Sequence, residues 1–176
     1  MNSLKFITLL FLFLNCKTNE NKFNIDTNHS AFIENAISDF SKTKLFKNGI
    51  VFSLKTKQIN DEIVLVSIIE SNDNKYLYSK EKKIDENKLP SKCFELNNKL
   101  FVWWDDNHKI DKVTFDLLAK YNLLQDDENG MILLPDSSID DNKKGVDYFF
   151  CKSDSRKFKR IISNKGFVSV PTINCK

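Results

Sequence analysis

The chain has 176 residues and a formal net charge of +3, with 27 Lys and Arg residues against 24 Asp and Glu residues. This even balance excludes a strongly basic nucleic-acid-binding domain, and we expect no nucleic-acid partner. The chain has only four glycines, which are spaced too widely for a dinucleotide-binding fingerprint or a P-loop, so nucleotide-binding folds of those kinds are also excluded.

The first sixteen residues have the pattern of an export signal. One cation, Lys5, precedes an apolar run from Phe6 to Leu14, which is followed by Asn15 and Cys16. The run is less than half as long as the ~20 apolar residues that a transmembrane helix needs. The pattern therefore predicts a segment that directs export and is not part of the fold. The alternative is a buried N-terminal helix that happens to end near a cysteine.

The end of this segment resembles the signal of bacterial lipoproteins, in which the residue after the cleavage point is a cysteine that becomes lipid-modified. The matching residues are Phe13, Leu14, Asn15 and Cys16. The family usually has Gly, Ala or Ser before the cysteine, and Asn15 departs from that pattern. The resemblance implies that residues 1–15 are a signal peptide and that Cys16 carries a lipid anchor.

Lipoprotein sorting also implies a location. An Asp after the lipidated cysteine commonly retains such proteins in the inner membrane, whereas this chain has Lys17. Residues 17–22 contain no acidic stretch of the kind that directs some lipoproteins to the cell surface. The resemblance therefore implies anchoring at the periplasmic face of the outer membrane.

Behind the signal, residues 16–30 are mostly polar, with Phe23 and Ile25 as the sizeable apolar residues, and predict a flexible tether that carries the lipidated cysteine. Residues 31–176 have the length of a single globular domain. Apolar residues at three- and four-residue spacing predict a first helix near 31–44, with Ser30 available as its N-cap. These residues are Phe32, Ile33, Ala36, Ile37 and Phe40.

Strand patterns follow this helix. Alternation over 50–59 and a β-branched run over 62–69 predict a hairpin, and residues 76–78 predict a third strand. Two further strands, 93–96 and 100–104, flank Asn97 and Asn98, which tolerate the left-handed conformation of a tight turn.

The spacing of apolar residues becomes helical again near 111–124, which predicts a second helix. A final hairpin is predicted over 146–152 and 157–163, with a short strand at 167–170. The order of these elements indicates an α+β fold with two helices and a mainly antiparallel sheet of about five to seven strands. The 15 phenylalanines predict a core rich in this residue.

With Cys16 lipidated, three cysteines remain, Cys93, Cys151 and Cys175. In an oxidising compartment they allow one disulfide and one free thiol. A bridge between Cys151 and Cys175 is favoured because it would fix the end of the chain, which packing alone leaves loose. The alternative is that all three thiols are reduced and that Cys93 and Cys151 are small buried residues.

Only one segment suggests catalysis. Asp105, Asp106 and His108 follow a predicted strand and could support acid-base chemistry or bind a metal. Adjacent carboxylates on an extended backbone point in opposite directions, and a solvated turn before the next helix also explains these residues. We therefore expect no catalytic residue, no metal and no cofactor.

The last hairpin carries the most uneven charge. Its basic residues are Lys152, Arg156, Lys157, Lys159 and Arg160, offset within that stretch by Asp154. They could bind an acidic protein or anionic lipid headgroups. The alternative is an ordinary hairpin whose charges protect an edge strand from aggregation.

The favoured function is that of a membrane-anchored lipoprotein with a non-catalytic binding domain. One alternative is an immunity protein that neutralises a periplasmic toxin, by analogy of architecture. Another is a cell-envelope hydrolase that uses Asp105, Asp106 and His108, and a third is a structural component of the envelope.

Overall fold

The computed structural model describes residues 30–71, 76–78, 89–104, 110–126, 144–163 and 170–175. These residues contain helices and strands in an α+β arrangement, so the predicted fold class is confirmed. The helices are α1 (Ser30–Phe40), α2 (Lys44–Asn48) and α3 (Lys112–Lys120). The strands are β1 (Val51–Gln58), β2 (Ile63–Glu70), β3 (Tyr76–Tyr78), β4 (Lys92–Leu96), β5 (Lys99–Trp103), β6 (Leu124–Asp126), β7 (Gly145–Cys151) and β8 (Asp154–Ser163).

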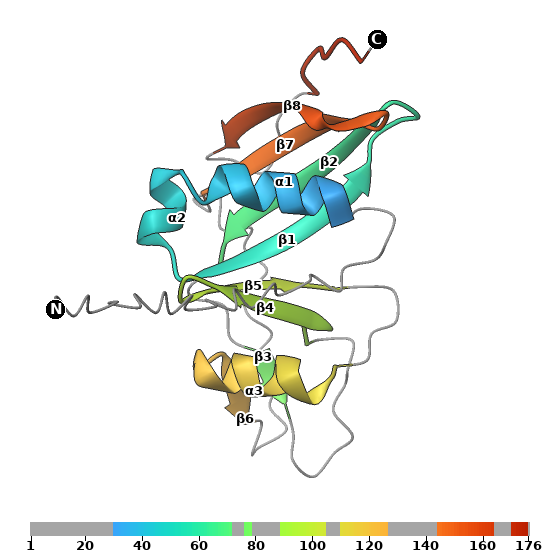
Figure 1. The fold of residues 1–176 in the computed structure, drawn as a ribbon. Coiled ribbons are helices and arrows are strands. Elements are labelled where there is room, and N and C mark those ends of the chain that lie inside the picture. Colours follow the sequence, from blue (N-terminus) through green and yellow to red (C-terminus); the bar gives the residue numbers. More distant parts are fainter. Residues whose placement is uncertain are drawn as a thin grey trace, which may run out of the picture.

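Six strands form one sheet in the order β4-β5-β1-β2-β7-β8, and β3 pairs with β6 in a separate two-stranded sheet (Figure 1). Neighbours in the large sheet are antiparallel except β1 and β5, which are parallel. The sheet is therefore mainly antiparallel, as predicted. The parallel contact joins two hairpins, β1–β2 and β4–β5, side by side.

Helix α1 lies across one face of the large sheet (Figure 1). Its five buried residues are those whose spacing predicts the helix. The predicted helix near 31–44 is interrupted, however, because Thr43 begins a second helix. The Thr43 hydroxyl donates to the carbonyl of Phe40 at 2.7 Å and accepts from the amide of Phe46 at 3.2 Å. One side chain thus ends α1 and caps α2.

The core under α1 is rich in phenylalanine, as predicted. The Phe40 ring lies 4.9 Å from the ring of Phe52 and 5.9 Å from that of Phe46, between centroids. Phe101 from β5 packs 5.3 Å from Phe52, so the cluster joins both helices to β1 and β5. Edge-to-face and offset aromatic pairs of this kind add stability beyond the apolar area that they bury.

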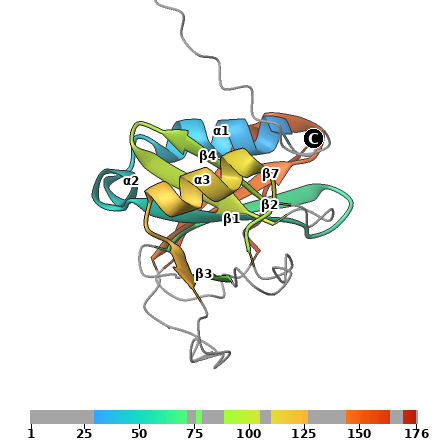
Figure 2. The ribbon, with the colours of Figure 1, turned by 90° about the horizontal axis from the view of Figure 1, so that it is seen from below.

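A second core forms on the other face. Side chains alternate along a strand, so Val51 of β1 and Leu100 of β5 point away from α1. They pack with Leu118 of α3 and Tyr76 of β3. Figure 2 shows α1 on one side of β1 and β3 on the other. The sheet is thus covered on both faces at its β1–β5 part.

The second predicted helix, near 111–124, is shorter than expected. It ends at Lys120, and Asn122 follows with a φ of 54°. This left-handed residue turns the chain, so that Leu124 lies in β6 and not in the helix. In the β4–β5 turn, Asn97 and Asn98 have φ values of 51° and 59°, which confirms the predicted left-handed turn.

Helix α3 begins with a charged cap. The Asp111 carboxylate accepts a hydrogen bond from the amide of Thr114 at 2.7 Å, and Lys92 lies 3.5 Å away. Burial opposes ionisation, but these hydrogen bonds and the Lys92 charge hold the pKa of Asp111 below its ordinary value of 3.8. The lowered pKa means that the ionised carboxylate stabilises the folded state.

Stability should therefore fall in acid. The contribution of Asp111 is complete above pH 3.8 and is lost as the pH falls through the lower folded-state pKa. Urea denaturation at pH 7 and at pH 3 would measure it. Asp111→Ala should cost about 1 kcal/mol at pH 7. Asp111→Asn keeps a capping oxygen, so its free energy of unfolding should fall less between pH 7 and pH 3 than that of the wild type. Asp116→Asn, at an exposed site on α3, is the control for the loss of one carboxylate. An unchanged acid sensitivity in Asp111→Asn would contradict the charged cap.

None of the helices among the described residues is long and apolar enough to cross a membrane. Several predicted features lie outside the described residues. They are the signal peptide 1–15, the tether up to residue 29, the segment that contains Asp105, Asp106 and His108, and most of the strand at 167–170.

Candidate functional site

The basic residues of the last hairpin do not form one cluster. Lys152 lies in the β7–β8 turn, and Arg156 and Arg160 lie further along β8. Because a strand rises about 3.3 Å per residue, Arg156 and Arg160 are about 13 Å apart along β8. Lys157 and Lys159 alternate with them, so β8 directs its charges to both sides of the sheet edge. The structure thus separates this candidate site into two ends.

Arg160 is part of a contact between α1 and the sheet. Its Nη1 donates to Asp39 Oδ2 at 2.8 Å, and the hydroxyl of buried Tyr148 donates to the same oxygen at 3.2 Å. Burial, followed by the Asp39 charge, raises the pKa of Tyr148 far above its ordinary value. The hydrogen bond to Asp39 likewise raises the pKa of Arg160. Tyr148 thus remains a neutral donor, and this ion pair fixes α1 on β7 and β8.

The other end of the hairpin is also partly engaged. Arg156 Nε donates to Asp154 Oδ1 at 3.1 Å in an exposed local pair. Lys152 borders a surface pocket of about 410 Å³ that is also lined by Asp61, Glu62, Ser153 and Cys175. None of the described residues in this lining has a large aliphatic or aromatic side chain of the kind that lines most small-ligand pockets. We assign no ligand to it.

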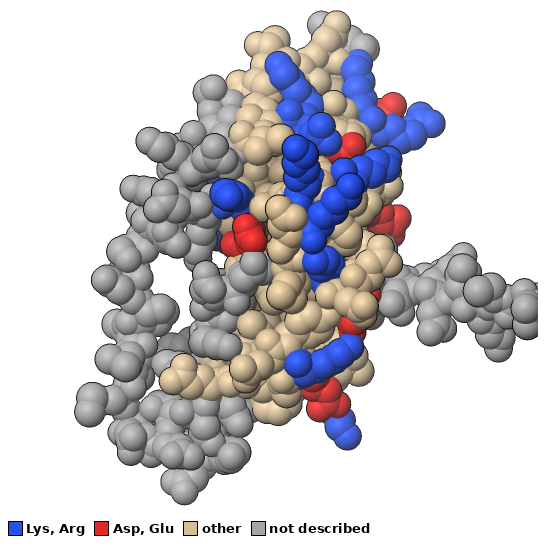
Figure 3. Space-filling model, turned by 90° about the vertical axis from the view of Figure 1, so that its left-hand side faces the viewer, with Lys and Arg blue, Asp and Glu red and all other residues tan. Residues whose placement is uncertain are grey.

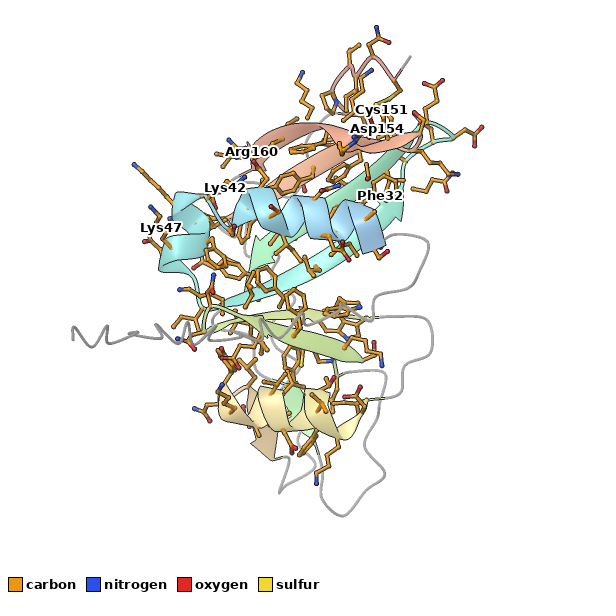
Figure 4. The ribbon with its side chains drawn as sticks, in the orientation of Figure 1. Phe32, Lys42, Lys47, Cys151, Asp154 and Arg160 are labelled. Atoms are coloured by element: carbon orange, nitrogen blue, oxygen red, sulfur yellow. A yellow bond between two sulfur atoms is a disulfide. The ribbon has the colours of Figure 1, made fainter. Side chains whose placement is uncertain are left out.

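More lysines gather at α2. Lys42, Lys44 and Lys47 are exposed, and Figure 4 shows Lys42 and Lys47 at the same end of the molecule as Arg160. Lys99 extends from β5 to the C-terminal carbonyls of α2, where its Nζ donates to Lys47 and Gly49. A cation at this position complements the partial negative charge of the helix end. Viewed from the α2 side, the molecule shows many basic and few acidic side chains (Figure 3).

Cys151 and Cys175 form a disulfide, with sulfurs 2.10 Å and Cα atoms 5.4 Å apart. This is the pair that the sequence favours. Cys93 is free and half-buried, and its Sγ lies 3.6 Å from the carbonyl oxygen of Thr114. Burial raises the pKa of the Cys93 thiol to about 11, so little reactive thiolate forms near neutral pH.

Cys16 and the proposed hydrolase residues Asp105, Asp106 and His108 lie outside the described residues. In the part of the chain that is described, no group of three or more His, Cys, Asp or Glu side chains could hold a metal ion. Comparison of the chain with protein-family models, curated proteins and solved structures finds no match.

The basic residues in and just before α2 are the feature that the sequence reasoning missed. Lys42, Lys44 and Lys47 fall within six residues, next to the first predicted helix. That spacing is a visible signal of local positive charge. Their proximity to Arg160 depends on the tertiary fold. Arg160 binds Asp39, at the end of α1 next to these lysines, and the two residues are 121 positions apart in the sequence.

Proposed function

We propose that this chain is exported, loses residues 1–15, and is anchored by lipid on Cys16 at the periplasmic face of the outer membrane. The proposal depends on one observation, the cation and short apolar run that end at Cys16. The Cys151–Cys175 disulfide supports it, since structural disulfides persist in oxidising compartments outside the cytoplasm. Lys17, which replaces the retaining Asp, supports the outer membrane.

We propose further that the globular domain acts by binding a negatively charged partner rather than by catalysis. Support comes from the α2 end, where Lys42, Lys44 and Lys47 are exposed and make no ion pair with any described residue. Uncompensated charge of one sign attracts a partner of the opposite sign.

Replacement of Cys16 tests the anchor. In cells fed a palmitate analogue, wild-type protein should carry the label and sediment with membranes. Cys16→Ala should lose the label and move to the soluble fraction, because acyl chains supply about 0.8 kcal/mol of membrane affinity per buried methylene. Cys93→Ala is the matched control and should keep both the label and the location. Continued labelling of Cys16→Ala would overturn the proposal.

A further inference from the structure

Basic side chains gather on the surface at the α2 end of the molecule (Figure 3). We call it the α2 basic face and define it as Lys42, Lys44, Lys47, Lys99, Lys144 and Arg160. Figure 4 places Lys42, Lys47 and Arg160 together, at the end opposite Cys151 and Asp154. Lys144, which directly precedes β7, lies at the same end. Its carbonyl accepts a hydrogen bond from the amide of Glu70 at 2.9 Å, and Glu70 ends β2 beside the start of β1.

Few carboxylates offset these cations. Among the described residues at this end, Asp39 is bound to Arg160, Glu70 ends β2, and Asp147 of β7 accepts a hydrogen bond from Ser67. Lys42, Lys44, Lys47 and Lys144 have no ion-pair partner in the described part of the chain. Their ammonium groups are therefore available to anions in solution or on a surface.

An exposed aliphatic side chain accompanies the charge. Ile162 of β8 is 67% exposed, and it pairs with Val146 at the end of the sheet where β7 begins. Ile162 lies two residues beyond Arg160, whose hydrogen bond to Asp39 fixes the C-terminal end of α1. Ile50, which directly follows α2 and Gly49, is 51% exposed. Aliphatic side chains among lysines suit the headgroup region of a bilayer, where the apolar groups enter and the ammonium groups stay at the phosphates.

The chain length between the anchor and this face permits contact with the membrane. The 14 residues from Cys16 to His29 can span at most about 50 Å. Helix α1, with 11 residues, separates the end of that segment from α2 by only about 16 Å. A lipid anchor also keeps the domain at a high effective concentration near the surface, so a weak attraction is sufficient for docking.

We infer that the α2 basic face binds anionic phospholipid headgroups of the membrane in which Cys16 is anchored, and that it holds the domain against the bilayer. This inference rests on the proposed lipid anchor, which keeps the domain at a high local concentration near the membrane. Each lysine near an anionic surface contributes about 1 kcal/mol, which is roughly a fivefold effect on the docking equilibrium. Removing three lysines should therefore weaken docking about 100-fold.

Lysine acylation of the full lipidated protein tests the inference. The protein would be reconstituted into vesicles of phosphatidylcholine alone or mixed with phosphatidylglycerol in equal parts. It would then be treated with a water-soluble amine-reactive reagent and analysed by mass spectrometry. Lys42, Lys44 and Lys47 should react at least about fivefold more slowly on the anionic vesicles, whereas exposed Lys55, Lys57 and Lys112 should react equally on both. High salt should abolish the difference.

Two variants with the same change in net charge complete the design. The readout is the slower acylation of Lys144 on anionic vesicles. This protection should be lost in the triple variant Lys42→Gln/Lys44→Gln/Lys47→Gln and kept in the triple variant Lys55→Gln/Lys57→Gln/Lys112→Gln. Flotation with the phosphatidylcholine vesicles reports on the anchor alone, so loss of the anchor is distinguishable from loss of docking. Equal reactivity of the face on both vesicles would overturn the inference. Protection seen only in native envelopes would also overturn it, in favour of an acidic protein partner.

Discussion

Phe40→Ala should lower the free energy of unfolding by about 3 to 5 kcal/mol, because it removes a fully buried ring and leaves a cavity. Phe40 lies where α1 meets the sheet, with the rings of Phe46, Phe52 and Phe101 within 6.3 Å between centroids. A domain of this size has a total stability of about 5 to 15 kcal/mol. The variant should therefore lose a large fraction of its stability and unfold at a much lower urea concentration than the wild type. Urea denaturation followed by tryptophan fluorescence would measure the change.

Two further variants calibrate this result. Phe40→Leu keeps most of the apolar volume and should cost less than Phe40→Ala. Val113→Ala removes methyl groups from a side chain that is 66% exposed on α3, and it should change stability by no more than about 0.5 kcal/mol. A loss below about 1 kcal/mol for Phe40→Ala would mean that the aromatic cluster does not hold α1 on the sheet.

Cys175→Ser should cost about 3 kcal/mol. The disulfide closes a loop with a sequence separation of 24, and in the chain-entropy model a loop of that size restricts the unfolded chain by about this amount. Reduction with dithiothreitol should bring the wild type to the stability of the variant, and it should leave the variant unchanged. Denaturant unfolding with and without reductant would measure both effects.

Thiol counting provides an independent check on the same bridge. Unreduced protein that is denatured and alkylated should be modified at Cys93 and not at Cys151 or Cys175. In the folded state Cys93 should react slowly at neutral pH, because its pKa is raised to about 11. Alkylation of Cys151 and Cys175 without reduction would contradict the disulfide.

Local patterns were sufficient to predict much of the fold. The spacing of Phe32, Ile33 and Ala36 depends only on the geometry of one helix, and the Asn97–Asn98 turn depends only on two residues that tolerate a positive φ. The break before α2 also had a local signal, since Thr43 is a favourable N-cap. It was missed because the apolar spacing continues through Phe40 towards Leu45 and Phe46.

The rest of the fold and site depends on contacts between distant parts of the chain. No local pattern specifies that β1 pairs in parallel with β5, because that pairing depends on how two complete hairpins pack. The pairing of Arg160 with Asp39 likewise requires α1 to lie across β8. Sequence reasoning therefore found a basic hairpin, whereas the fold places one of its arginines beside the lysines of α2.

The central position of β2 implies that the strands of the sheet assemble at different times. β1 and β2 are joined by a short connection and can pair as soon as both are present. β7 must pair with β2 from far along the chain, as between Ser67 and Asp147, which are separated by 80 positions. Until then, the edge of β2, rich in Ile and Val, offers unpaired backbone groups that can recruit another chain. In a chain that emerges from its N-terminus, this edge of β2 stays uncovered until β7, which begins at Gly145, has also emerged.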